Sequence, residues 1–450
     1  MEFLDTICAI STPLGSGGIG VIKISGKDSL AVVEKMINKP ITALENRKLV
    51  LCKVTTENFC DHALVVYYKA PHTYTGEELV EIQCHGGMYL AQGILNECIK
   101  NGARLAQNGE FTKRAFLNGK ISLDSAEGVI DMINAETESA VRAGYDLLNG
   151  ELKKRVKVLQ DKLTDIFAEI EVSLDYPEET IEFSSRKQIL GWVNEAINYI
   201  NGLLETYVTG NLVKNGVRCA IIGAPNVGKS STMNSLLGYS RAIVTNIAGT
   251  TRDVLEESYV YKTIKFNLID TAGIRESEDT IEKIGIERAY DNLKSADIVL
   301  FIIDSEVGLS LEYQDLLNKV RDKKVLVCFN KIDLVNDTKS LQEIIGDIPY
   351  VEISAKNEQG IIDLKEKLFS MVINSNIQNN FMITSVRHKE LLERALKSLM
   401  ECVENINSNV DLDLVNIDVV EAWNAIGEIT GETMAEDRIN TIFAKFCLGK

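Results

Sequence analysis

The ten residues GAPNVGKSST, at positions 223–232, combine the residue types that bind phosphate groups. They fit the pattern G-x-x-x-x-G-K-[ST], whose specified positions are Gly223, Gly228, Lys229 and Ser230. In such a loop the glycines let backbone N–H groups surround a phosphate, the lysine reaches the terminal phosphates, and the hydroxyl ligates Mg²⁺. The apolar run VRCAII comes before this stretch and a helical pattern comes after it. The sequence therefore predicts a phosphate-binding loop between a buried strand and a helix.

Two further motifs place polar groups around the metal ion and the γ-phosphate of a nucleotide. GTTRD at 249–253 contains Thr251, whose hydroxyl can complete a Mg²⁺ shell when the γ-phosphate is present. DTAG at 270–273 follows an apolar run, so Asp270 is expected at the carboxyl end of a strand, holding the metal through water. The backbone N–H of Gly273 is expected near the γ-phosphate. These motifs follow the phosphate loop in the order that a GTPase requires.

Two later motifs select the base. NKID at 330–333 supplies Asp333, whose carboxylate can accept both guanine N1–H and N2–H₂, a pair that adenine lacks. SAK at 354–356 adds a backbone N–H, that of Ala355, for guanine O6. The four motifs together predict a GTPase. The predicted GTP-binding residues are Asn226, Val227, Gly228, Lys229, Ser230, Ser231, Thr245, Asn246, Ile247, Ala248, Gly249, Thr250, Thr251, Asp270, Thr271, Ala272, Gly273, Asn330, Lys331, Asp333, Ser354, Ala355 and Lys356.

The catalytic device has to differ from that of many regulatory GTPases, which place a glutamine directly after DTAG to orient water, because this chain has Ile274. Asn226 carries a carbonyl oxygen beside the β,γ-phosphates and, with carbonyls of the loop at 244–251, could bind a monovalent cation. The alternative is that Asn226 only braces the turn. Glu282 could position water through a bridging molecule, although a solvated charged face also explains it. The predicted ligands of Mg²⁺ are Ser230 and Thr251.

The hydrophobic pattern divides the chain into segments of different fold class. Short strand-like runs with one helical pattern predict an α+β N-terminal domain, and strands that alternate with helices predict a doubly wound, Ras-like, parallel-rich sheet. We therefore predict a multidomain protein in which an α/β P-loop GTPase domain is inserted into an all-α helical domain. The predicted segments are 1–118 (N-terminal), 119–212 (helical, first part), 213–375 (GTPase) and 376–450 (helical, second part).

Long amphipathic helices are expected on both sides of the nucleotide segment, because apolar residues recur there at spacings of three and four. The first predicted apolar stripe is Leu152, Val156, Leu159, Leu163, Ile166 and Ile170. The second is Trp192, Ile197, Ile200 and Leu204. The third, after residue 380, is Leu391, Leu392, Ala395, Leu399 and Val403.

The composition and net charge of the chain exclude some classes of function. The chain has 450 residues and a formal net charge of −17, which argues against a protein that coats nucleic acid nonspecifically. The amino terminus lacks a basic region and the longest apolar runs are short, so neither a signal peptide nor a membrane span is expected. Nine scattered cysteines without a CxxC pair predict reduced thiols in the cytoplasm.

At this point the chain resembles, over its whole length, the MnmE/TrmE family of tRNA uridine-modification GTPases. In the nucleotide segment the resemblance is carried by GAPNVGKSS, TNIAGTTRDV, DTAGIRE and IEKIGIER. Outside that segment it is carried by YTGEELVEIQCHGG (74–87), GEFTKRAFLNGKISLDSAEGVIDMI (109–133) and FCLGK (446–450). Other GTPases lack these last three motifs, so they give the resemblance its specificity.

The resemblance implies an N-terminal domain that dimerises and binds 5-formyltetrahydrofolate or a related folate, and GTP hydrolysis activated by potassium-dependent pairing of the GTPase domains. It implies a flavoprotein partner, MnmG/GidA, joined in a heterotetramer, and an aminomethyl-type product at C5 of the wobble uridine of certain tRNAs. Carried over by motif, Asn226, Lys229 and Glu282 are catalytic, with Glu282 on the water. The implied ligands of K⁺ are Asn226, Thr245, Ile247 and Thr250. The folate contacts are Lys23, which stands where relatives have arginine, Glu81, Lys120 and Lys450, and Cys447 matches a near-terminal functional thiol.

Several simpler interpretations stay open. The glycine-rich stretch 15–20 is most simply a turn, CHGG at 84–87 a turn against a bound ligand, and the basic helix at 153–162 a solvated face, with tRNA contact as its alternative. Cys447 could equally be a small core residue. Two other functions compete with the main prediction: a GTP-gated module of ribosome assembly, and a self-sufficient folate-dependent one-carbon transferase.

Overall fold

A computed structural model describes residues 5–13, 15–175, 186–238, 257–270, 293, 295–372 and 381–449. The chain folds into two compact units, which are described separately. Unit 1 comprises Met1–Ile130, Leu147–Ile197 and Arg394–Lys450, and unit 2 comprises Asp131–Asp146 and Asn198–Glu393. Within the described residues, no helix is both long enough and apolar enough to cross a membrane. The four predicted segment boundaries stay predictions.

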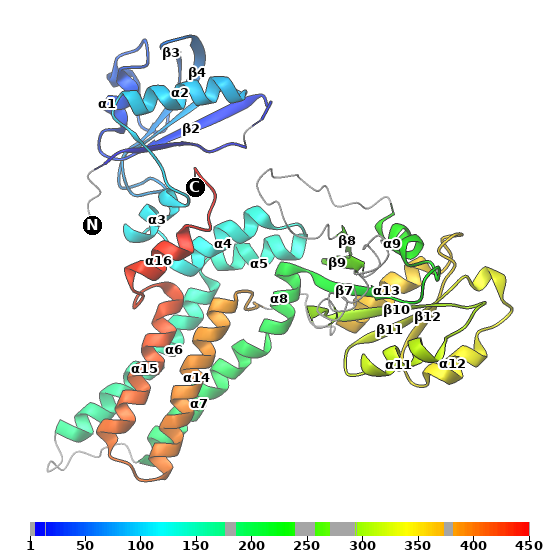
Figure 1. Ribbon diagram of the computed structural model, residues 1–450. Helices are drawn as coiled ribbons and strands as arrows, with labels where there is room; N and C mark the ends of the chain where they lie inside the picture. The colour runs from blue at the N-terminus through cyan, green and yellow to red at the C-terminus, as the bar shows by residue number, and fades with distance from the viewer. Residues whose placement is uncertain are drawn as a thin grey trace, which may run out of the picture. The chain divides into compact units, whose positions relative to one another are not determined.

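The amino-terminal part of unit 1 is a six-stranded sheet in the order β3-β4-β5-β2-β1-β6, antiparallel except for the pair of β1 and β6. The strands are β1 (Ile7–Ile10), β2 (Ile19–Ser25), β3 (Leu49–Thr55), β4 (Cys60–Tyr68), β5 (Leu79–His85) and β6 (Arg104–Leu105). The helices α1 (Ser29–Glu34) and α2 (Met88–Lys100) pack against one face and form its apolar core, as Figure 1 shows for α2. The expected α+β domain is confirmed.

Alternation along these strands gives the sheet two different faces. In β2, Ile22 and Ile24 are fully buried under the helices, while Lys23 lies on the opposite face. On that opposite face Leu49 and Leu51 of β3 are 56% and 55% exposed. Within unit 1, apolar side chains are therefore exposed on the β3 part of this face, whereas helix α3 (Glu110–Leu117) covers its β1 part, where Phe111 packs with Ile7 and Ala9.

The rest of unit 1 is helical. Its helices are α3 (Glu110–Leu117), α4 (Leu123–Asn134), α6 (Glu151–Asp175), α7 (Arg186–Glu205), α14 (Val386–Asn407), α15 (Leu412–Thr430) and α16 (Glu436–Phe443), of which α4, α7 and α14 continue into unit 2. Long helix α6 packs along α15 (Figure 1). Every residue of the first predicted stripe is buried, as expected, because that stripe faces the neighbouring helices.

In the second predicted stripe Ile200 is buried and Ile197 and Leu204 are half-buried, but the prediction is wrong at Trp192. Trp192 is 37% exposed, whereas the buried positions of α7 recur at spacings of four and three. They are Ile189, Val193, Ala196, Ile200 and Leu203. The sequence prediction placed Trp192 in the apolar face because tryptophan is large and apolar. The packing of the neighbouring helices instead buries the face that carries the small Ala196.

Unit 2 contains a six-stranded sheet in the order β12-β11-β10-β7-β9-β8, in which only β8 is antiparallel. The strands are β7 (Val217–Ile222), β8 (Glu257–Tyr261), β9 (Ile264–Asp270), β10 (Ile298–Asp304), β11 (Val325–Asn330) and β12 (Tyr350–Glu352). The helices are α5 (Glu138–Leu148), α8 (Tyr207–Asn215), α9 (Lys229–Leu237), α11 (Leu311–Lys319), α12 (Lys339–Ile345) and α13 (Ile361–Val372). The predicted parallel-rich α/β fold is confirmed.

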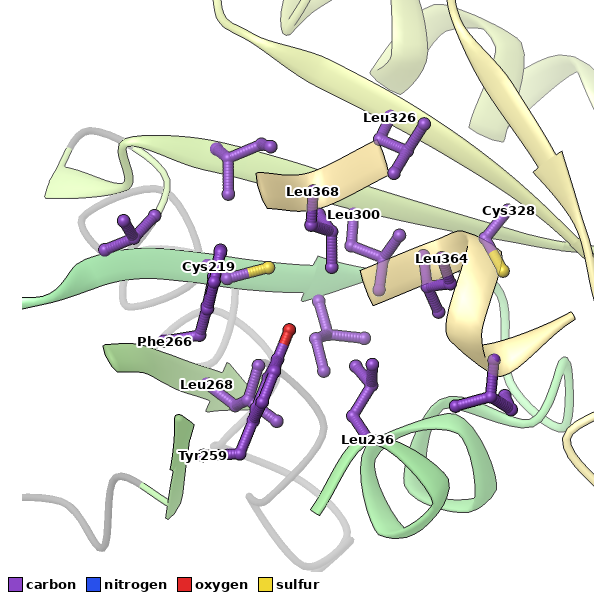
Figure 2. Packing of buried hydrophobic residues seen from close by; sticks show 14 of the residues in the cluster. Cys219, Leu236, Tyr259, Phe266, Leu268, Leu300, Leu326, Cys328, Leu364 and Leu368 are labelled. Carbon is purple, nitrogen blue, oxygen red and sulfur yellow. The ribbon is translucent and has the colours of Figure 1, made fainter. Parts of the chain in front are cut away.

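Helices cover both faces of this sheet because its strands are apolar on both sides. One face packs against α9 and α13, with Leu236 and Leu364 in its core. The other packs against α11 and α12. Figure 2 shows the first core, in which Cys219 of β7 lies among apolar side chains of the strands and of both helices. Burial raises the pKa of Cys219 to about 12, so this thiol stays protonated and inert.

Tyr259 of β8 is fully buried in the core of Figure 2, stacked on Phe266 with ring centroids 5.2 Å apart. Its hydroxyl has no hydrogen-bond partner among the described residues. We expect Tyr259→Phe to leave the free energy of unfolding of unit 2 unchanged or to raise it by up to ~1 kcal/mol, because the substitution removes an unsatisfied buried polar group. Amide hydrogen exchange of β8 and β9 measures the effect.

Tyr261 provides the matched control on the same strand, because its hydroxyl hydrogen-bonds Glu366 at 2.9 Å. Tyr261→Phe removes a satisfied bond and is expected to lower the free energy of unfolding by ~1 kcal/mol or less. A Tyr259→Phe variant that loses more stability than Tyr261→Phe would contradict the prediction.

Candidate nucleotide site and N-terminal site

The predicted nucleotide motifs meet at one edge of the sheet of unit 2. Strands β7, β9 and β11 are parallel, and each ends where a motif begins: the phosphate loop after Ile222, DTAG at Asp270 and NKID at Asn330. The carboxyl ends of parallel strands are where doubly wound folds bind ligands. Three motifs that begin at residues 223, 270 and 330 therefore start at one edge of the sheet.

The phosphate loop has the backbone that its motif requires. Asn226 has φ 62°, in the left-handed region, and Gly228 at φ 96° directly precedes helix α9. The Lys229 ammonium donates to the carbonyls of Gly223 and Ala224, both at 2.8 Å, so it lies across the mouth of the loop. The amino terminus of α9 and the ammonium both favour an anion at this position.

Asn330 joins three of the motifs. Its Nδ2 donates to the carbonyl of Val227 at 2.8 Å, and its Oδ1 accepts from the backbone N–H of Ala355 at 3.0 Å. A Cβ at Gly228 would lie 2.2 Å from Asn330 Nδ2, so only glycine admits this contact. The N–H of Ala355, predicted to bind guanine O6, donates to Asn330 in this structure. The buried asparagine thus fixes the base-binding motifs to the phosphate loop.

Asp304, at the end of β10, was missed by sequence reasoning. Its Oδ2 accepts from the ammonium of Lys331 at 2.6 Å, and the backbone N–H of Glu306 donates to Oδ1. Burial raises the pKa of Asp304, but the bonds from Lys331 and this N–H outweigh it and leave the pKa below its ordinary value. The ion pair orients the NKID lysine. The sequence signal that could have identified Asp304 is its position at the end of the apolar run IVLFIID, a strand whose carboxyl end lies at the same sheet edge.

Of the other predicted nucleotide residues, some lie within the described part of the chain and the rest lie outside it. Ser230, Ser231, Asp333 and Lys356 are exposed and Ser354 is buried. Asp270 is described as the last residue of β9. The remaining predicted residues lie outside the described part of the chain; they are Thr245, Asn246, Ile247, Ala248, Gly249, Thr250, Thr251, Thr271, Ala272, Gly273 and Glu282, together with Ile274.

A second candidate site lies on the face of the unit 1 sheet that is opposite α1 and α2. Lys23 of β2 and Glu81 of β5 are direct cross-strand partners, so the structure brings two of the predicted folate residues together. The ammonium of Lys23 lies 6.0 Å from the ring centroid of Tyr74, whose hydroxyl bonds Thr112 at 2.9 Å. Tyr74 was not among the predicted contacts, although it opens the motif YTGEELVEIQCHGG. A cation, a carboxylate and an aromatic ring therefore lie together on this face.

Lys120 reaches the loop that carries Tyr74. Its ammonium donates to the carbonyl of Pro71 at 2.9 Å, and its side chain packs beside Gly76. The carboxyl terminus approaches the same sheet, because Ser11 Oγ, just after β1, donates to the carbonyl of Gly449 at 2.9 Å. Lys450, the fourth predicted folate contact, lies outside the described residues.

A buried network of ion pairs contacts the loop that carries Tyr74. Arg114 of α3 is fully buried and pairs with Asp5, Glu77 and Glu110 at 2.8, 3.1 and 3.0 Å. Glu77 Oε2 also accepts from Ser25 Oγ at 2.7 Å, which ties the loop containing Tyr74 to the end of β2. The network links motifs 74–87 and 109–133, and sequence reasoning had not connected them.

Several open interpretations are decided by the structure. The glycine-rich stretch 15–20 belongs to the connection of β1 and β2 and to the start of β2. In CHGG, Cys84 and His85 end strand β5, and Gly86 and Gly87 form the connection to α2, where a Cβ at Gly86 would lie 2.0 Å from the carbonyl of Gly17. Contact of this motif with a bound ligand stays a prediction. The described residues contain no cluster of side chains suited to a metal ion. The nine cysteines form no disulfide. Cys447 is exposed, which contradicts its reading as a core residue.

The basic helix carries mostly paired charges. Lys154, Lys157 and Lys162 pair with Glu151, Asp161 and Glu195 respectively at 2.6 to 2.9 Å. Exposed pairs of this kind contribute little to stability. The pairing favours a solvated face over a site for the tRNA backbone.

Comparison with known proteins gives matches along the whole chain. Residues 6–120 match the family described as GTP-binding protein TrmE N-terminus, and residues 123–447 match the MnmE helical domain. The tRNA modification GTPase MnmE of Clostridioides difficile (strain 630) is 41% identical over 455 residues, which is 99% of this chain and 99% of the relative. The protein of the same name from Alkaliphilus metalliredigens (strain QYMF) is 42% identical over 457 residues, again 99% of each chain.

Solved structures match a smaller part of this chain. The G domain of the T. maritima FeoB iron transporter is 32% identical and covers 35% of this chain and 99% of its own, with a TM-score of 0.28. Era from Aquifex aeolicus, bound to GDP and AlF4−, is 26% identical and covers 41% of this chain and 66% of its own, with a TM-score of 0.29.

Proposed function

The chain belongs to the MnmE family of tRNA modification GTPases, and from this premise we propose that its GTP hydrolysis drives modification of C5 of the wobble uridine in certain tRNAs. The product carries an aminomethyl or carboxymethylaminomethyl group, and a flavoprotein of the MnmG/GidA kind is the partner, in a heterotetramer. The complex works in the cytoplasm. The supporting observation is identity of about two residues in five to full-length relatives of that name, over 99% of both chains.

Hydrolysis proceeds by in-line attack of water on the γ-phosphate. The backbone N–H groups of the loop and the Lys229 ammonium hold the phosphates and stabilise the charge that develops on them. The ammonium already lies at the mouth of the loop, bonded to two of its carbonyls. Asp333 selects guanine, with Asn330 fixing the position of that motif. Glu282 orients the attacking water in this proposal.

Two metal ions fit the donor groups of the loop. The Ser230 hydroxyl lies exposed in the first turn of α9 and, with Thr251, would hold Mg²⁺. Asn226 has an exposed amide in a left-handed turn and would hold K⁺ with Thr245, Ile247 and Thr250. When bound, these ions supply positive charge that stabilises the phosphates in the transition state. Binding of K⁺ would pair the GTPase domains of two chains.

We expect Asn226→Ala to remove the activation of GTP turnover by K⁺. In the parent protein, turnover in K⁺ should exceed turnover in Na⁺ by ~10-fold or more, since a correctly placed charge contributes on the order of a few kcal/mol. In the variant the two rates should coincide. Steady-state phosphate release in each salt at equal ionic strength measures the effect.

Asn226→Asp is the control for that prediction, because it keeps an oxygen ligand at the same position. It should retain a preference for K⁺, whereas equal turnover of the parent in both salts would remove the potassium assignment altogether.

The N-terminal site is proposed to bind a folate. Lys23, Lys120 and Lys450 would pair with its carboxylates, Glu81 would accept from the N–H groups of its ring, and Tyr74 offers an aromatic face beside Lys23. The exposed leucines on the same face of the sheet support a homodimer, since a contiguous apolar face on a sheet is a surface suited to pairing.

The tRNA function is tested by mass spectrometry of wobble nucleosides from cells in which this gene is deleted and from cells in which Asp270→Ala replaces it. Loss of C5-aminomethyl-type uridines in both strains is expected, because Asp270 belongs to the nucleotide site. Restoration by the parent gene is the control. Unchanged nucleosides in the deletion strain would refute the proposed function and redirect attention to ribosome assembly.

A further inference from the structure

Three polar contacts connect the segment 131–146 of unit 2 to the edge of the sheet opposite the nucleotide site. The ammonium of Lys214, at the end of α8, pairs with Asp131 at 2.8 Å. The ammonium of Lys265, at the start of β9, pairs with Glu136 at 2.8 Å. Ser139 Oγ donates to the carbonyl of Thr263 in the turn before β9.

The two attachment points of this segment are themselves joined. Asn267 Nδ2 of β9 donates to the carbonyl of Asn215, the last residue of α8, at 3.0 Å. Between α8 and β7, Gly216 at φ 79° lies so close to β9 that a Cβ would be 3.0 Å from the carbonyl of Lys265. The start of β7 and the start of β9 therefore behave as one packed element.

The same two strands, β7 and β9, end at the predicted nucleotide-binding motifs. They are paired in register from Val217 with Phe266 to Ile221 with Asp270. The seven residues of β9 span about 20 Å and end in the aspartate of DTAG, while β7 ends in the phosphate loop. A shift of either loop can thus be transmitted along a paired, buried strand to the contacts with Asp131, Glu136 and Ser139.

The three contacts lie around a cavity. The cavity measures about 280 Å³ and is lined by Asp131, Glu136, Lys214 and Lys265 among others. Thr384 also lines it, is 2% exposed, and its hydroxyl has no hydrogen-bond partner among the described residues. Because polar bonds and an unsatisfied hydroxyl line this cavity, the segment can shift by exchanging a small number of polar bonds.

We propose that Asp131, Glu136 and Ser139 are positioning residues that couple the nucleotide state of the sheet to the helical segment 131–146. The coupling runs through β7 and β9, so the segment takes one arrangement with GTP bound and another with GDP. This inference rests on the GTPase activity and is independent of the tRNA chemistry. Failure of the proposed tRNA function and failure of the coupling are therefore separately observable.

The test compares amide hydrogen exchange of residues 131–146 in the full chain with GDP and with a non-hydrolysable GTP analogue. The parent should show a nucleotide-dependent difference in protection of ~2- to 10-fold in this segment. Glu136→Lys should abolish the difference, because it places two ammonium groups together, and the swap Glu136→Lys with Lys265→Glu should restore it. In Glu136→Lys, kcat for GTP should change by about two- to five-fold while KM stays constant.

Lys262→Ala is the matched control. Lys262 lies in the same β8–β9 turn and pairs with Glu366 at 2.7 Å, but its partner is on α13 and not in the segment 131–146. This variant should keep the difference in exchange. Ser139→Ala, a milder change, should reduce the difference if Glu136→Lys fails to fold. The proposal is overturned if the parent shows no difference, if the swap restores nothing, or if Lys262→Ala acts like Glu136→Lys.

Discussion

Lys229→Ala is expected to lower the rate of GTP hydrolysis by ~10²- to 10³-fold, the loss typical of one charged or hydrogen-bonding group aimed at developing charge. The structure gives the reason, because the ammonium lies at the mouth of the phosphate loop, 2.8 Å from two of its carbonyls. No other lysine of the described residues bonds these carbonyls. Single-turnover hydrolysis with saturating enzyme separates the chemical step from weakened nucleotide binding.

Two variants accompany this prediction. Lys229→Arg keeps the charge but replaces a compact ammonium with a planar fork, and it should recover little of the activity. Lys319→Ala removes an exposed lysine at the end of α11 and should leave hydrolysis unchanged. If Lys229→Ala retained more than a tenth of the parent rate, the assignment of this loop as the catalytic phosphate site would fail.

Arg114→Met is expected to lower the free energy of unfolding of unit 1 by ~3–5 kcal/mol, the cost of breaking a buried ion network from one side. The arginine is fully buried and pairs with Asp5, Glu77 and Glu110, so its removal leaves Glu77 without its cation and leaves Asp5 and Glu110 with Arg104 alone. Both tryptophans of the chain, Trp192 and Trp423, belong to unit 1. Denaturant unfolding monitored by tryptophan fluorescence therefore reports on this unit.

Arg104 provides the matched control, since it pairs with Asp5 and Glu110 as well but is 44% exposed in its side chain. Arg104→Met should cost ~1 kcal/mol or less, because solvent screens its pairs. Equal losses for the two variants would show that burial of Arg114 does not set the cost.

The dependence of the free energy of unfolding on pH below neutrality gives an independent test of the ion network around Arg114. Burial raises the pKa of Glu110, but hydrogen bonds from Arg104, the backbone of Gln107 and Arg114 outweigh it and lower the pKa below its ordinary value. A depressed folded pKa contributes stability above the unfolded value, about 4.3, and this contribution is lost as the pH falls through the folded pKa. The parent should therefore lose stability below about pH 4.3 more steeply than Arg114→Met does.

The sequence by itself determined the nucleotide chemistry. The glycines, Lys229 and the hydroxyl of the phosphate loop have fixed spacing because a phosphate has fixed size, and such local geometry is readable in ten consecutive residues. The alternation of strands and helices predicted the parallel sheet of unit 2 for a similarly local reason. The face of α7 was not readable, because the neighbouring helices, and not the residue sizes, selected Ala196 over Trp192.

Tertiary structure decided what connects the motifs. Asn330 joins the phosphate loop to Ala355, Asp304 orients Lys331, and Arg114 ties α3 to the loop of Tyr74. Each of these contacts spans between 25 and 103 positions of the chain, and sequence spacing carries no information on pairs so far apart. They exist because sheet register and helix packing bring particular polar atoms within hydrogen-bond distance, which depends on the whole fold and not on any one segment.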